Sequence, residues 1–106
     1  MTRLPYTAVT SAGEAFDIQF PLHSETRSAE AVADLLTSVL GAISARVESG
    51  QGVSDGDVLQ ALAMAMAVRA RLVAVPPKTS LNLMHGLVDA SFAATLSANR
   101  YQGGRG

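Results

Sequence analysis

The sequence predicts a mainly helical protein in which an N-terminal β-hairpin precedes three antiparallel helices, assembled as a homodimeric helical bundle. Two patterns support this fold class. Apolar and polar side chains alternate with a period of two before residue 22, which is typical of strands, and from residue 28 apolar residues recur every three or four positions, as in helices. A length of 106 residues is sufficient for one hydrophobic core.

The hairpin is expected at about 6–10 and 14–20. Phe16, Ile18 and Phe20 alternate with Asp17 and Gln19, so one face of the second strand is apolar. The segment between the two strands ends in a glycine, which can adopt the positive φ that a tight turn requires. Two strands alone are only marginally stable in water, so the apolar face must pack on the helices or on a second chain.

The first helix is expected at about 28–49. Ser28 can cap its first turn, and Gly50 can take the left-handed conformation after its last turn. Its apolar residues form one stripe, made of Val32, Leu35, Leu36, Val39, Leu40, Ile43 and Val47.

The second helix is expected at about 55–75. Ser54 and Asp57 have the spacing of a helix start, and Pro76 follows the last helical residue because proline interrupts a helix. Between Gln60 and Val75 the only charged side chains are two arginines, so the helix is apolar on nearly every side.

The third helix is expected at about 80–98, with Thr79 or Ser80 as its cap. The chain is thus divided into a hairpin arm at 1–22, a three-helix domain at 23–99 and a flexible glycine-rich tail at 100–106.

Self-association is expected because the second helix has no polar face to present to solvent. In a monomeric three-helix bundle one face of each helix is exposed to solvent and is polar. A contiguous apolar patch on such a face marks an interaction site. The competing arrangement is a monomer whose hairpin covers this helix. The predicted interface consists of Phe16, Ile18, Phe20, Leu62, Met66, Arg69 and Val73.

The polar residues are weaker candidates for a functional site than the predicted apolar interface. His85 and Asp89 share a helix face at a spacing that can hold a metal, but no third ligand is visible, so a solvated polar stripe is the favoured interpretation. Arg69 and Arg71 could anchor an anionic ligand or a partner's carboxylates. We favour a structural role, with their stems on apolar surface and their guanidinium groups in water or paired with Glu48 or Asp89.

Composition excludes several classes of partner. The net charge of −1 lacks the basic excess of a nucleic-acid-binding protein. The most apolar window, 61–75, is shorter than the roughly 20 residues that cross a bilayer, so no membrane partner is expected. There are no cysteines, and the N-terminus has no signal-peptide pattern, which favours a cytoplasmic location.

The predicted function is that of a small, non-enzymatic, oligomerising interaction or accessory protein, without cofactor, metal or catalytic residue, because no nucleophile, acid pair or cofactor loop is recognisable. One alternative is a DNA-binding regulator in which the second and third helices form a helix-turn-helix-like pair, presenting Lys78, Thr79, Ser80, Asn82 and His85. Another is a small-molecule-binding module with a pocket at the hairpin–helix or dimer interface.

Overall fold

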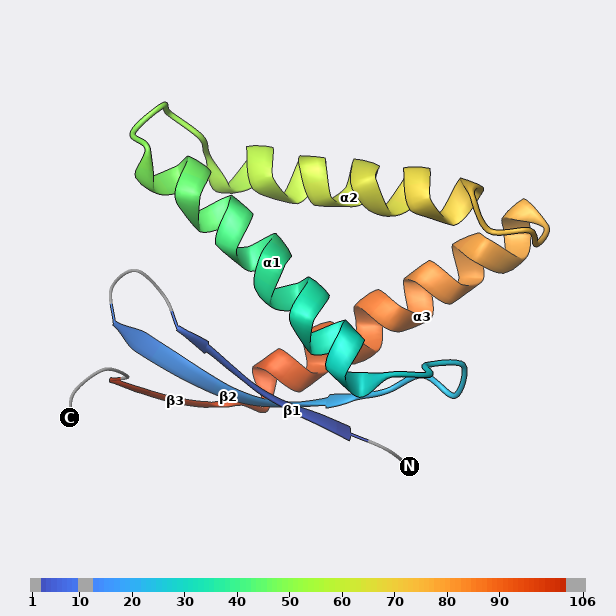
Figure 1. Cartoon of the computed structure of the whole chain (residues 1–106), viewed down its shortest axis with the longest axis horizontal. Coiled ribbons are helices and arrows are strands. Elements are labelled where there is room, and N and C mark those ends of the chain that lie inside the picture. The colour runs from blue at the N-terminus through green and yellow to red at the C-terminus, as the bar shows by residue number, and fades with distance from the viewer. Residues whose placement is uncertain (1–2, 10–12, 103–106) are drawn as a thin grey trace. The chain divides into compact units, whose positions relative to one another are not determined.

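The computed structural model describes residues 3–9 and 13–102, and the chain divides into two units. Unit 1 comprises Met1–Leu36 and Leu87–Gly106, which hold the sheet, the start of the first helix and the end of the third. Unit 2 is Thr37–Gly86, which holds the rest of these two helices and the whole of the second. Figure 1 labels the elements in chain order.

The predicted hairpin is confirmed. Strands β1 (Arg3–Val9) and β2 (Glu14–Pro21) pair antiparallel, so that Thr7 lies opposite Asp17 and donates a hydrogen bond of 2.7 Å from Oγ1 to Oδ1. Gly13, directly before β2, has a φ of 87°, the positive value expected of a glycine in this turn.

A third strand, β3 (Asn99–Gln102), was not predicted. It pairs antiparallel with β2, giving the order β1-β2-β3 (Figure 1). We had expected a helix to about 98 and a flexible tail at 100–106; residues 100–102 instead belong to the sheet, and 103–106 lie outside the described residues. The pairing stabilises the strand through ladder hydrogen bonds with a segment distant in sequence, which local composition cannot indicate.

The core of unit 1 lies on the sheet. Among the described residues the buried apolar side chains are those of Leu4, Ala15 and Ile18. The register places Leu4 opposite Phe20 and Tyr6 opposite Ile18, so these four side chains share one face. The rings of Tyr6 and Phe20 have centroids 6.4 Å apart and a tilt of 51°, a favourable aromatic arrangement.

Three helices follow in the predicted order: α1 (Ala29–Glu48), α2 (Asp55–Arg71) and α3 (Pro77–Leu96). The α2 helix ends at Arg71 rather than at 75. After it the backbone hydrogen bonds span three residues, as from the Leu72 N–H to the Arg69 carbonyl, and Val75 disfavours the helical conformation because it directly precedes a proline. The α3 helix begins at Pro77 rather than at 80. Proline is well suited to the first helical position, where its missing N–H would have no partner.

The caps confirm the predicted starts of α1 and α2, but not the predicted cap of the third helix at Thr79 or Ser80. The Ser28 hydroxyl accepts a hydrogen bond of 3.0 Å from the Ala31 backbone N–H. Ser54 and Asp57 form a complete capping box, in which each side chain accepts a 3.1 Å bond from the other residue's backbone N–H. Gly50 follows α1 with a φ of 77°, the left-handed conformation predicted there.

Candidate functional site

The apolar side chains of the helices are the main candidate for an interaction surface, because the single chain leaves them exposed. All residues of α1, α2 and α3 are described; none in α1 or α2 is buried, and Ser80 is the only buried residue of α3. In unit 2, thirteen large apolar side chains are exposed: Val39, Leu40, Val47, Leu59, Leu62, Met64, Met66, Val68, Leu72, Val73, Val75, Leu81 and Leu83.

The size of this surface can be estimated from the exposed fractions, which range from 36% to 68%. Complete burial of a Val, Leu or Met side chain contributes about 1.5–3 kcal/mol, so covering the exposed half of thirteen is worth roughly 10–20 kcal/mol. At about 25 cal/mol/Å² this corresponds to about 400–800 Å² of apolar area. One partner's share of a standard protein–protein interface is about 800 Å².

The predicted interface residues of the second helix are all exposed. Leu62, Met66 and Arg69 lie along one side of α2, whereas Val73 follows the end of the helix. The side is accessible in the single chain, as an interface with another molecule requires.

The predicted interface residues on the hairpin are placed differently. Ile18 is 5% exposed and belongs to the core of unit 1, whereas Phe16 and Phe20 are half-buried. β1 pairs with one edge of β2 and β3 with the other, so the outer edges of β1 and β3 are the ones that a further strand could join among the described strands. Pro5 lies in β1 and has no N–H to donate, which weakens the β1 edge as a template for pairing.

Unit 2 contains a groove of about 500 Å³ between the end of α1 and the start of α2. Apolar side chains dominate its lining, with Val39, Ile43 and Leu62 among the largest, and Arg46 and Asp57 contribute the charges. The sequence analysis identified Leu62 but not the contribution of α1, because the meeting of two helix faces depends on their packing.

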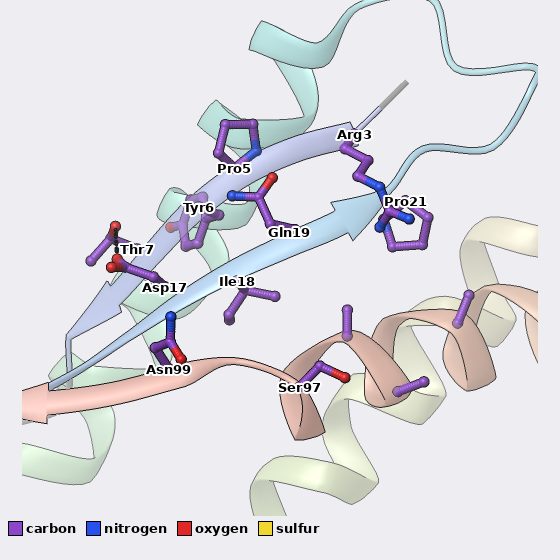
Figure 2. Close-up of a pocket in the computed structure, with 13 residues that line it drawn as sticks. Arg3, Pro5, Tyr6, Thr7, Asp17, Ile18, Gln19, Pro21, Ser97 and Asn99 are labelled. Atoms are coloured by element: carbon purple, nitrogen blue, oxygen red, sulfur yellow. Dashed lines mark hydrogen bonds between the residues drawn. The ribbon is translucent and has the colours of Figure 1, made fainter. Parts of the chain in front are cut away.

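Unit 1 contains a pocket of about 790 Å³, lined by the sheet and the end of α3. Arg3, Asp17 and Asn99 supply a guanidinium, a carboxylate and an amide, and alanines of α3 supply apolar surface. Figure 2 shows Ile18 directed from β2 toward α3, and the hydrogen-bonded pair of Thr7 and Asp17 on the neighbouring strands. No local motif marks Arg3 or Asn99, because they line one pocket only through the pairing of their strands with β2.

His85 and Asp89 lie on α3 and are both exposed. Within the described residues, no group of three or more His, Asp or Glu side chains is arranged to hold a metal ion. His23 accepts a hydrogen bond of 3.0 Å at Nδ1 from the Glu25 backbone N–H, in an exposed turn far along the chain from α3.

Arg69 and Arg71 occupy the last turn of α2, where positive charge is favourable next to the negative end of the helix dipole. Both side chains are exposed. The helix terminus therefore accounts for their position without a bound ligand.

The residues proposed for DNA contact lie at the start of α3. Ser80 is buried at 6% exposure and is not available to a ligand, while Lys78, Thr79, Asn82 and His85 are exposed.

Among the described residues, no helix is both long and apolar enough to cross a membrane.

Comparison of the chain with protein-family models, with curated proteins and with solved structures finds no match.

Proposed function

We propose that this protein is a small, non-enzymatic interaction protein that works as a homodimer or as a self-associating accessory subunit. The observation that supports this proposal most strongly is the absence of any buried residue in α1 and α2, whose residues are all described. Helices in water are stabilised mainly by burial of an apolar face, so these helices require a covering surface. A second copy is the simplest source, since two-fold dimers are the commonest soluble oligomers. We also propose a cytoplasmic location, in keeping with a chain that has no cysteine.

Light scattering after size exclusion tests the proposal. The expected mass is about 22 kDa, twice the 11.0 kDa of one chain, since a closed two-fold dimer is expected. A mass that is a higher multiple of 11.0 kDa would support self-association but would indicate an oligomer larger than the dimer. A mass of 11 kDa with the elution volume of a folded monomer would contradict the proposal.

A second candidate function is binding of a small molecule in the pocket of unit 1. Its volume of about 790 Å³ lies within the range of about 300–1,000 Å³ typical of ligand sites. The lining combines alanines of α3 with the charged groups of Arg3 and Asp17, which favours a ligand with an apolar body and a polar edge.

Native mass spectrometry of the purified protein tests this second candidate. The expected result is a retained small molecule that is lost in Ala93→Trp, because Ala93 lines the pocket and the larger ring fills it. Ser91→Trp is the matched control, since Ser91 lies on the same helix and is not among the lining residues. Protein without a retained molecule, or equal loss in both variants, would count against the site.

A further inference from the structure

The groove of unit 2 has the character of a docking site for a protein helix. Of the side chains that line it, only Arg46 and Asp57 are charged, and the others are apolar, among them Val39, Ile43, Val58 and Leu62. An amphipathic helix that lays its apolar face into such a groove is a recurrent mode of protein recognition.

The apolar surface extends well beyond the groove, which favours a long occupant over a small molecule. Along α2 it continues from Leu62 to Met66, and past the helix end to Leu72 and Val73, all exposed. At 1.5 Å per residue, the nine steps from Leu62 to the last residue of α2, Arg71, span about 14 Å. A second helix matches both the length and the apolar character of this strip.

Two features point to a second copy of this chain as the occupant. The exposed apolar area of unit 2, about 400–800 Å² summed over all sides of its helices, is of the order of the share that each partner contributes to a stable interface, and the groove side supplies part of it. The groove also carries one cation and one anion, so across a two-fold axis Arg46 of each copy can face Asp57 of the other. The capping hydrogen bond to Ser54 uses one oxygen of the Asp57 carboxylate, which leaves the other to accept from a guanidinium.

We propose that α2 of a second copy docks in the groove between α1 and α2 of unit 2, in a reciprocal two-fold arrangement that places Ala61 and Ala65 at the close approach. Both alanines line the groove, and small side chains let two helices come near each other. This inference rests on the proposed self-association and specifies the surface that carries it.

A pair of arginine substitutions on α2 tests the location. Ala65→Arg places a charge inside the groove, whereas Ala67→Arg places the same charge two residues further along α2, where the side chain does not line it. Arginine has nearly the helix propensity of alanine, so neither substitution disrupts α2 itself. We expect Ala65→Arg to raise the dissociation constant of the dimer about 30-fold or more, as for a central interface residue, and Ala67→Arg to change it less than about threefold.

Sedimentation velocity over a dilution series supplies the dissociation constants, and circular dichroism at each concentration reports helix content. For Ala65→Arg, loss of dimer at concentrations where Ala67→Arg stays dimeric supports the groove, whether or not the released chain keeps its helices. Equal dissociation constants for the two variants would overturn the assignment of the groove as the docking site, while leaving self-association intact. A wild-type monomer at every concentration would instead overturn the proposed function.

Discussion

Replacing Ile18 by alanine is expected to lower the free energy of unfolding by about 2–5 kcal/mol, the cost of truncating a buried aliphatic side chain. Ile18 is 5% exposed, and among the described residues it is one of only three buried apolar side chains, together with Leu4 and Ala15. It lies opposite Tyr6 in the central strand of the sheet. On the face that Ile18 shares with Leu4 these two are the buried apolar side chains among the described residues, so the loss of one removes a large share of that burial.

Urea denaturation followed by circular dichroism measures this effect, with all variants at one protein concentration. Val9→Ala is the matched control, because Val9 is an apolar residue of the same hairpin but is 63% exposed. Its expected cost is below about 1 kcal/mol, which reflects strand propensity alone. Similar destabilisation by the two substitutions would show that Ile18 does not form the core of unit 1.

The melting temperature of the wild-type protein is expected to rise with protein concentration, because folding and association are coupled when helices are covered by a second copy. A tenfold increase in concentration shifts a dimer's equilibrium by about 1.4 kcal/mol. With an unfolding entropy of about 2.1 cal/mol/K per residue over two chains, this amounts to about 3 °C for each tenfold step.

Differential scanning calorimetry or fluorimetry across a hundredfold range of concentration checks this expectation, with a predicted total change of about 6 °C. The Ala65→Arg variant provides an internal comparison, because it is expected to melt at a lower temperature at every concentration in this range. A melting temperature that stays constant across the range would contradict the dimer and would indicate that one chain covers its own apolar surface.

The features that sequence predicts best are those whose hydrogen bonds close within a few residues. The Ser28 and Ser54 caps, the positive φ of Gly13 and Gly50 and the order of the helices all follow from local chemistry, and all are present. The helix ends near Pro76 were misplaced by several residues. Proline acts on the residue before it and also suits the first position of the next helix, and sequence reasoning used only its role as a terminator.

The excess of apolar residues on α2 was also evident from the sequence, because a helix with so few polar side chains cannot present a polar face to solvent. Which residues line the groove of unit 2 was not evident. The groove combines Val39 and Ile43 of α1 with Val58 and Leu62 of α2, and the facing of two helices depends on their packing rather than on the periodicity of either one.

The sequence by itself therefore determined the mainly helical class, the hairpin, the caps and the surplus of apolar surface. Tertiary structure alone decided that Asn99–Gln102 forms a strand, that Ile18 belongs to the core and that Arg3 and Asn99 line a common pocket. Each of these depends on β3 pairing with β2 or on α3 lying near the sheet, which brings together residues from opposite ends of the chain. Local propensity reports the conformations that neighbouring residues favour, whereas a contact over such a separation is set by the free energy of the whole fold.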